Sequence, residues 1–526
     1  MGIYLNPNNA AFRKAINSKI YVDKSMMIAY TNENLNSEHE EICVSRPRRF
    51  GKSMAANMLV AYYSRGCDSR ELFKDLKIAQ HPDFEEHLNK YNVIHVNMLD
   101  ILNRFESLQD MISHLQKRLI WELKQEYGDI NCFDWNDLVT VMETIFAETG
   151  HSFIVIIDEW DCLFREKQND KQAQKDYLDF LRFWLKDKSY MSLAYMTGIL
   201  PIKKYGKHSA LNMFDEFSMT NAEPIEEFTG FTEDEVKNLC QTYDMDFDET
   251  KKWYDGYCLN QCSIYNPKSV VEAMMRRKFD NYWTKTETYE SIKTYIVMNY
   301  DGLRDTIAQM IAGERKKIDT TTFTNDMVTF QIQDDVLTLL IHLGYLAYDF
   351  DTKEIFIPNY EIREQFISTV RVLGWDDVIK SIQLSDKLLD ATLNGDAEKV
   401  AEIVEQVHDE NTSILQYNNE NSLSCILSLA YYSAKKSYVM YRELAGGKGF
   451  ADLVFIPRKE CQTPAFIVEL KWNKSAEAAI DQIKQKKYSE SLKVYSGEIL
   501  LVGINYDKDA KDDTKKHTCV IERVTK

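Results

Sequence analysis

The sequence predicts a multidomain α/β chain with two α/β segments separated by helical material. Its 526 residues exceed one ordinary domain, and the length suggests about three or four. Hydrophobic residues make up 44% and aromatic residues 12%, enough to fill several cores and too many for a disordered chain. Short apolar runs alternate with longer amphipathic stretches, a pattern typical of a parallel sheet covered by helices.

Charge is unevenly distributed along the chain. The sequence carries 64 Lys and Arg against 82 Asp and Glu, and the net charge of −18 argues against a basic coat for nucleic acid or membrane. Residues 441–526 carry 16 basic against 13 acidic residues. A polyanion therefore fits the C-terminal part best, whereas the acidic remainder favours a protein partner or a homo-oligomer.

The sequence contains no pattern typical of secretion or membrane insertion. Its first residues lack the charged start and apolar core of a signal peptide, and no apolar run approaches the roughly 20 residues that span a bilayer. Cys258 and Cys262 are the closest pair of ten cysteines, with no second pair or histidine cluster at zinc spacing. We expect a reduced, cytoplasmic protein without a membrane anchor.

The N-terminal α/β segment, residues 1–230, has the pattern of a parallel sheet with helices between its strands. Apolar residues at helical spacing predict helices over Asp110–Tyr127 and Gln174–Lys186. The four expected strands are Glu41–Ser45, Val93–Asn97, Phe153–Ile157 and Ser192–Thr197.

A phosphate-binding loop follows the first of these strands and precedes a helix, which is the context of a P-loop. Gly51 lets backbone amides turn toward phosphate, Lys52 would reach the β- and γ-phosphates, and Ser53 would ligate Mg²⁺. Arg46 replaces the first glycine of the pattern G-x-x-x-x-G-K-S, and the loop arginines are expected to pair with phosphate. The predicted nucleotide-binding residues are Arg46, Arg48, Arg49, Phe50, Gly51, Lys52, Ser53 and Asp158.

A second motif strengthens the prediction of ATP binding. The buried strand that begins at Phe153 ends in two carboxylates, of which Asp158 would hold Mg²⁺ and Glu159 would orient the attacking water. The two motifs occur in the order that a P-loop ATPase requires. At the end of the next strand, Thr197 would either sense the γ-phosphate or be a plain strand-end residue.

Helical material separates the two α/β segments. Thr232–Tyr243 begins with a capping pattern and predicts a helix. Short helices are expected from Trp253 onward, closing on a hairpin with strands Tyr345–Phe350 and Glu354–Pro358. This pattern predicts a winged-helix-like lid over residues 231–362, followed by a helical connector over residues 363–410.

The last segment, residues 411–526, is expected to run helix, strand, strand, strand, helix, strand. If Ile456 pairs with Ala465 across the turn, Asp452 lies directly opposite Glu469, where two like charges repel. A divalent metal removes that repulsion, and carboxylate oxygens suit Mg²⁺ or Mn²⁺. The Leu470 carbonyl is a further candidate ligand.

Lys471 lies on the same face as Glu469, because residues alternate along a strand. An ammonium group there would position or deprotonate water and stabilise charge on a phosphate. The alternative is a charged edge hairpin without chemistry. The next helix, about residues 475–489, carries lysines that either steer a phosphodiester backbone or form a solvated face.

With these motifs, the chain resembles a bacterial family that joins an AAA-ATPase-like domain to a PD-(D/E)XK nuclease domain. The resemblance implies a P-loop NTPase core with a helical lid and a restriction-endonuclease-like C-terminal domain. It also implies that Arg is common at the position of Arg46. The residues that carry it are Tyr21–Ser25, Ser45–Ser53, Ile157–Asp161, Trp253–Tyr257, Tyr265–Pro267, Asp452 and Glu469–Lys471.

The resemblance places the nuclease motif on Asp452, Glu469 and Lys471. It implies accessory roles for Gln482 and Tyr488 on the following helix. The upstream acidic position of the family stays open between Glu420, on the first helix of the segment, and Glu443, at the end of the preceding strand.

Three functions fit these motifs. The first is an ATP-binding, ATP-hydrolysing protein coupled to a Mg²⁺-dependent nuclease, with DNA the favoured substrate. The second is a nucleotide-switched module that binds nucleic acid or protein through an inactive nuclease-like domain. The third is a degenerate ATPase with structural nucleotide, which the intact Lys52, Ser53, Asp158 and Glu159 disfavour.

Overall fold

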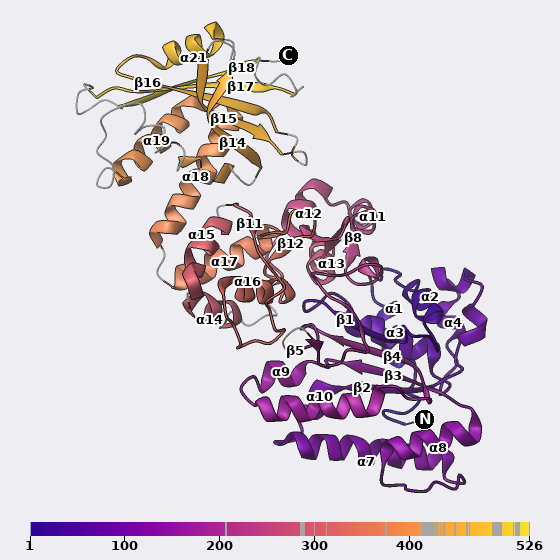
Figure 1. Ribbon diagram of the computed structural model, residues 1–526. Helices are drawn as coiled ribbons and strands as arrows, with labels where there is room; N and C mark the ends of the chain where they lie inside the picture. Colours follow the sequence, from indigo (N-terminus) through magenta and orange to yellow (C-terminus); the bar gives the residue numbers. More distant parts are fainter. Residues whose placement is uncertain are drawn as a thin grey trace. The chain divides into compact units, whose positions relative to one another are not determined.

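A computed structural model describes most of the chain (Figure 1). The described residues are 2–205, 208–283, 290–298, 300–311, 313–373, 376–411, 427, 430–431, 433–434, 437–446, 449–458, 461, 463–486, 497–508, 510 and 516–524. They divide into two compact units. The first combines Met1–Asp301 with Lys317–Glu364, and the second combines Gly302–Lys316 with Gln365–Lys526.

A five-stranded parallel sheet forms the centre of the first unit, in the order β2-β3-β4-β1-β7. Its four longer strands confirm the four predicted ones, with ends that differ by at most one residue. β7 is only three residues long, too short for periodicity to predict. The strands are β1 (Glu41–Ser45), β2 (Asn92–Asn97), β3 (Phe153–Asp158), β4 (Met191–Gly198) and β7 (Asp215–Phe217).

Helices cover both faces of this sheet, as predicted (Figure 1). The helix after the phosphate loop, α3 (Lys52–Tyr63), packs with α1 (Ala10–Ile16) and α2 (Met27–Glu33) against one face, in one core cluster with strand residues. The other face carries α7 (Leu108–Tyr127), α8 (Leu138–Thr149) and α10 (Lys171–Leu185).

The two predicted helices of this segment, α7 and α10, begin two or three residues earlier than their apolar pattern indicates. Ser107 and Asp170 explain this, because their side chains accept hydrogen bonds from backbone N–H groups of the first turn. The remaining short elements are α4 (Arg70–Phe73), η1 (Lys77–Gln80), α5 (Phe84–His87), α6 (Met98–Leu102), α9 (Cys162–Glu166), β5 (Lys204–Tyr205), β6 (His208–Ser209) and η2 (Glu226–Phe228).

The segment after η2 contains the predicted capped helix. In α11 (Glu233–Tyr243), the Thr232 side chain and the Glu235 side chain form a capping box. The prediction of short helices alone was incomplete, because a three-stranded sheet in the order β8-β10-β9 lies here too. Its strands have two to four residues, too few for alternation to be visible. The elements are β8 (Phe231–Thr232), α12 (Phe247–Tyr254), β9 (Tyr257–Leu259), β10 (Cys262–Tyr265) and α13 (Pro267–Arg276).

The predicted hairpin is confirmed by β12 (Ala347–Asp349) and β13 (Glu354–Phe356), which pair antiparallel. Its turn contains Lys353 at a positive φ of 57°. Preceding elements are α14 (Glu290–Met298), η3 (Tyr300–Gly302), α15 (Leu303–Ile311), β11 (Lys316–Lys317) and α16 (Gln333–His342). The segment expected to be a helical connector is helical, as α17 (Tyr360–Val372), α18 (Asp376–Asn394) and α19 (Ala397–Asn411). Residues of α18 and α19 share a core cluster with strands of the second unit, so these two helices are part of that unit.

The second unit contains a five-stranded sheet in the order β14-β15-β16-β17-β18. Strands β16 and β17 are parallel, and the other pairs are antiparallel. The sequence predicts one strand after the last helix, whereas the structure has two. The second, β18, is not predicted because it is an edge strand with many polar residues. The expected first helix falls mostly on residues 412–426, outside the described residues. The elements are β14 (Tyr438–Gly446), β15 (Gly449–Pro457), β16 (Ala465–Trp472), α21 (Ala476–Gln485), β17 (Ile499–Tyr506) and β18 (His517–Val524).

Gly503 allows α21 to lie close to the sheet of the second unit. A Cβ atom at this position would lie 2.3 Å from the backbone oxygen of Ala476, which no side chain tolerates. Because Gly503 pairs with Glu469 in the neighbouring strand, the close approach brings α21 beside the predicted nuclease residues.

Among the described residues, no helix is both long enough and apolar enough to cross a bilayer.

A buried carboxyl group, Glu361 of α17, joins two parts of the first unit. Its Oε1 accepts hydrogen bonds from the backbone N–H groups of Tyr282 at 2.6 Å and Trp283 at 2.8 Å. Its Oε2 accepts one from the Ser269 hydroxyl at 2.8 Å. Burial raises the pKa of Glu361 to about 7, against an ordinary value of 4.5.

We expect Glu361→Gln to become more stable relative to wild type as pH rises. The raised pKa means that the Glu361 proton contributes stability below about pH 4.5, and this contribution is lost as pH rises through about 7. Glutamine keeps an accepting oxygen for both N–H groups and can donate to Ser269. Urea unfolding should show a relative gain of about 3 kcal/mol between pH 4.5 and 8.

Glu361→Ala is the matched contrast, because it leaves the two buried N–H groups without an acceptor. Relative to Glu361→Gln, which does not titrate either, it should lower the free energy of unfolding by about 2–4 kcal/mol at every pH. A difference between wild type and Glu361→Gln that does not vary with pH would contradict the buried-proton account.

Candidate functional site

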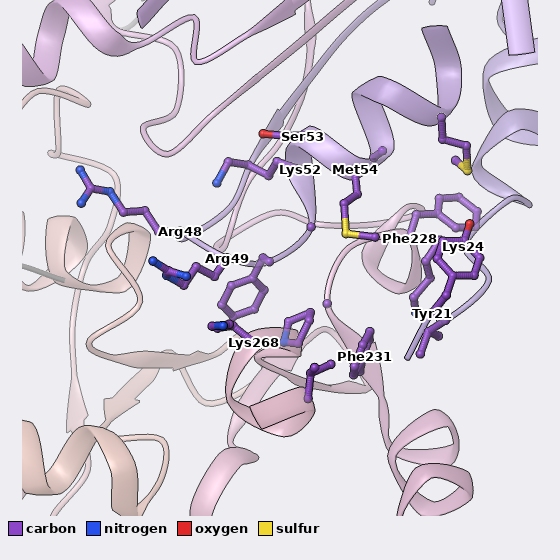
Figure 2. Close-up of a pocket in the computed structure, with 18 of the residues that line it drawn as sticks. Tyr21, Lys24, Arg48, Arg49, Lys52, Ser53, Met54, Phe228, Phe231 and Lys268 are labelled. Atoms are coloured by element: carbon purple, nitrogen blue, oxygen red, sulfur yellow. The ribbon is translucent and has the colours of Figure 1, made fainter. Parts of the chain in front are cut away.

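The first unit contains a cavity of about 650 Å³ at the phosphate loop. Residues from the N-terminal segment, the loop and α3, the end of β3, and the β8–α13 region surround it (Figure 2). Of the predicted site residues, it brings together Arg48, Arg49, Phe50, Gly51, Lys52, Ser53 and Glu159. Arg46, Asp158 and Thr197 do not line it.

The phosphate loop takes a left-handed turn before α3. Gly51 has a φ of 89° as the N-cap of α3, and Arg49 has a φ of 67°. The buried Lys52 ammonium donates to the backbone oxygens of Arg46 at 2.9 Å and Pro47 at 2.8 Å. Burial lowers the pKa of Lys52, while the carboxylates of residues 158, 159 and 161 oppose that shift. The loop thus holds the Lys52 ammonium against two of its own backbone carbonyl oxygens.

Arg46 points into the protein rather than into the cavity. Its guanidinium is fully buried, and its Nε donates to the Thr229 hydroxyl at 3.0 Å. Its Nη1 donates to the backbone oxygens of Ser45 and Phe217, both at 3.0 Å. These contacts replace the expected phosphate contact, so we now assign Arg46 the role of fixing the loop. Arg48 and Arg49, which are exposed and line the cavity, remain the phosphate-pairing candidates.

The loop also packs directly on later parts of the first unit. The backbone N–H of Gly230 donates to the Phe50 oxygen at 2.9 Å, and the rings of Phe50 and Tyr257 meet edge to face at 5.3 Å. A Cβ at Gly344 would lie 2.8 Å from the Pro47 side chain. The Tyr257 hydroxyl donates to the Gly344 oxygen at 2.6 Å, which closes the cluster. A shift of the loop must therefore move these contacts too.

The acidic end of the cavity lies where β2, β3 and β4 end together. Asp158 lies between Asn97 and Thr197 in the sheet, and its Oδ1 accepts the Glu159 N–H at 3.0 Å. Thr197 is buried, and its hydroxyl donates to the Val44 oxygen at 3.0 Å, so its contact is with the sheet. Glu159 has a φ of 53°, the left-handed region, and burial raises the pKa of its carboxyl group.

Arg165 of α9 is a cavity residue that the sequence does not single out. Its Nη2 forms an ion pair with Glu159 Oε2, and its Nε lies 3.2 Å from Asp161 Oδ2. The same oxygen of Asp161 accepts backbone N–H groups of Ile199 at 3.0 Å and Leu200 at 2.8 Å. A lone arginine in a five-residue helix offers no sequence signal for this position.

The opposite end of the cavity is aromatic and aliphatic (Figure 2). Tyr21 and Phe228 lie here beside Lys24, whose ammonium donates to Glu235 at 2.6 Å and to the Glu227 oxygen at 2.7 Å. Lys24 therefore holds the N-terminal segment against α11. Apolar rings at one end and arginines and a lysine at the other suit a nucleoside phosphate.

Asp23 fixes the other side of this N-terminal segment. Its Oδ1 accepts the Ser25 N–H and its Oδ2 accepts the Lys77 N–H at the start of η1, both at 2.8 Å. The Ser25 hydroxyl accepts the Ile78 N–H at 3.1 Å. The motif Tyr21–Ser25, which the sequence offers without a role, therefore anchors one wall of the cavity.

A second candidate site lies in the sheet of the second unit. Leu453 pairs with Val468 and Val454 with Ile467, which confirms the predicted register that sets Asp452 opposite Glu469. Asp452 Oδ2 accepts the backbone N–H of Leu470 at 2.8 Å.

Glu469 is the buried centre of this second site. Its Oε1 accepts the Lys471 ammonium at 3.2 Å and also the Gln482 side chain from α21. Its Oε2 is buried without a hydrogen-bond partner among the described residues. Burial, followed by repulsion from Asp452, raises the pKa of Glu469 to about 7, and Lys471 opposes this shift.

An oxygen site for a cation fits this arrangement. The unpartnered Glu469 oxygen and the Asp452 carboxylate supply anionic ligands, and the Leu470 carbonyl accepts Lys471 at 2.9 Å with a lone pair to spare. Within the described ranges, no three His, Cys, Asp or Glu side chains form a metal-binding group.

The remaining predicted residues of the second site are only partly described. Gln482 joins the site through Glu469. Glu443 lies in β14, whose side-chain position at this residue is outside the description. Glu420 and Tyr488 lie outside the described residues.

Comparisons with known proteins find two family models in the chain. Residues 10–207 match the model of a predicted AAA-ATPase, described as AAA-ATPase-like, and residues 418–515 match the PD-(D/E)XK nuclease superfamily.

A protein of Azotobacter chroococcum mcd 1, described as an uncharacterized protein in the vnfD 5′ region, is 24% identical over 255 residues. The match spans 47% of this chain and 47% of that relative, about half of its length. Two structures of the Aeropyrum pernix ORC2 protein, an ADPNP–ADP complex and an ADP form, cover 70% of this chain and 98% of theirs. Their identity is 9% and their TM-scores are 0.27 and 0.26, too low to support a structural argument.

We expect Thr229→Val to destabilise the first unit, because it removes the acceptor of Arg46 Nε while keeping the side-chain shape. A buried guanidinium N–H without a partner should lower the free energy of unfolding by about 1–3 kcal/mol in urea titrations. Thr242→Val is the matched control, since that exposed hydroxyl donates only to its own helix, at the Asn238 oxygen. Equal losses in both variants would contradict a fixing role for Arg46.

Proposed function

We propose that this chain, which joins an AAA-ATPase-like domain to a PD-(D/E)XK nuclease superfamily domain, is an ATP-binding hydrolase coupled to a metal-dependent nuclease. The proposed nuclease substrate is a nucleic-acid phosphodiester, with DNA favoured. Each activity has its own candidate site, and both sites are built from residues named above.

The proposed ATP site is the cavity at the phosphate loop. Arg48, Arg49 and Lys52 supply positive charge for the phosphates, and Ser53 supplies a hydroxyl for Mg²⁺. Asp158, at the end of β3, would hold the same ion through water, and Glu159 would orient the attacking water. Lys52 would exchange its two loop carbonyls for phosphate oxygens. Tyr21 and Phe228 would contact the base.

The proposed nuclease site consists of Asp452, Glu469 and Lys471, with Gln482 holding Glu469. A divalent metal bound there would act as a Lewis acid on the phosphodiester and make water more acidic. Lys471 would stabilise the negative charge that develops on the phosphate. The observation that carries the proposal is the buried, unpartnered Oε2 of Glu469, because an acid is stable there only when protonated or bound to a cation.

Lys471→Ala should abolish cleavage while nucleotide affinity is unchanged, because Lys471 belongs to the second unit alone. Labelled single- and double-stranded DNA and RNA, incubated with Mg²⁺ or Mn²⁺ with and without ATP, would test this. We expect a loss of at least about 100-fold, as for other groups that stabilise transition-state charge.

Lys474→Ala is the matched control, because it removes an exposed lysine three residues further along the chain. Lys52→Ala shows whether nucleotide controls cutting. Cleavage that survives both Lys471→Ala and Asp452→Ala would contradict the nuclease. Absence of any cleavage by a wild-type protein that binds ATP would favour a nucleotide-switched binding protein instead.

Mn²⁺ affinity at the second site should rise with pH and level off above about pH 7, since the metal displaces the proton of Glu469. Below that pH, affinity should fall about tenfold per pH unit. Lys471→Met should move the midpoint to higher pH, because the lysine lowers the pKa of Glu469. Calorimetry without nucleotide measures this, with Asp452→Ala as the site control, and a flat profile from pH 5 to 8 would contradict it.

A further inference from the structure

Arg165 connects the acidic end of the nucleotide cavity to the protein interior. It lines the cavity, although its side chain is only 6% exposed. One side of the guanidinium faces Glu159 and its Nε faces Asp161. The third nitrogen, Nη1, has no protein partner among the described residues, so the group keeps donors for a further acceptor.

Asp161 provides a fixed anchor for this arginine. Its Oδ2 accepts two backbone N–H groups that follow β4, and the strand residue Gly198 leaves room for it, since a Cβ there would lie 2.7 Å from Asp161 Oδ1. The side chain of Asp161 is fully buried, so its negative charge requires the positive charge of Arg165 both with and without a nucleotide in the cavity. The guanidinium therefore stays in place while its other donors change partners.

Glu159 is the weaker of the two partners. Its backbone has a left-handed φ of 53°, and its side chain is 21% exposed at the cavity. The ion pair directs Glu159 Oε2 toward Arg165, and a carboxylate paired in this way is a weaker acceptor for a proton of the attacking water. A group with more negative charge than one carboxylate would compete for the arginine.

We propose that Arg165 recognises the terminal phosphate of a bound nucleoside triphosphate and thereby releases Glu159. The proposal rests on the proposed nucleotide function and deepens it. With a diphosphate bound, Arg165 keeps its ion pair with Glu159 and the carboxylate is held away from water. With a triphosphate bound, the planar guanidinium contacts phosphate oxygens, and Glu159 becomes available. The exchange makes Arg165 both a phosphate contact and the residue that positions Glu159.

Binding of ATPγS and ADP, each with Mg²⁺, would test this by calorimetry on the full chain. Arg165→Met should weaken ATPγS binding by about tenfold or more and ADP binding by less than about threefold, since one charge-assisted contact is lost only from the triphosphate. Glu159→Gln should strengthen ATPγS binding several-fold, because the competing carboxylate is gone. That gain should vanish in the double variant, because it depends on Arg165.

Arg104→Met is the matched control, since it removes an exposed arginine outside the cavity lining and should change neither affinity. Where Arg165→Met does not fold, Arg165→Lys keeps the charge without the planar fork and should lose affinity for ATPγS selectively. Equal losses for ATPγS and ADP would overturn the proposal, as would a Glu159→Gln gain that persists without Arg165. A wild-type chain that binds neither nucleotide would instead refute the proposed function.

Discussion

The buried guanidinium of Arg46 is the contact on which the first unit depends. It occupies the place of a glycine in a phosphate loop, and three of its hydrogen bonds reach the end of β1, the edge strand β7 and Thr229. A charge buried this deeply is tolerated only where acceptors surround it. The contacts of Arg46 thereby hold the end of β1, β7 and the segment at Thr229 together at the start of the loop.

Both candidate sites keep an acid next to a cation, directly after the end of β3 in the first unit and within the central strand β16 in the second. Glu159 is paired with Arg165, and Glu469 with Lys471. In each case burial raises the pKa of the acid and the neighbouring cation opposes that shift. Such an ion pair is stable without a ligand, and a bound ligand can separate its two partners. A phosphate would compete with the acid for the cation, and a metal ion would compete with the cation for the acid.

The sequence predicts the main strands and the motifs of both candidate sites because apolar alternation and motif spacing are local properties. The register of Asp452 against Glu469 also follows from pattern alone, since one assumed pair determines the rest of a hairpin. Short strands such as β9 and β10 are missed because three or four residues carry no period.

Side-chain direction is harder to predict than position. The sequence places Arg46 in the loop, but whether it faces phosphate or the core depends on Thr229, nearly two hundred residues away. Arg165 is missed for the same reason, because its importance comes from the turn that brings α9 back onto Glu159. The aromatic wall at Tyr21 and Phe228 likewise arises from distant segments that meet only in the fold.

The contact between Arg46 and Thr229 has a consequence for how such chains can diverge. A relative that restores glycine at position 46 would leave a side-chain-sized void under the loop and an unused hydroxyl at position 229. Neither change is tolerated well alone, so drift at the two positions should be correlated. Covariation of positions 46 and 229 among relatives would then distinguish chains whose loop is supported by the arginine from chains whose loop is held by backbone contacts alone.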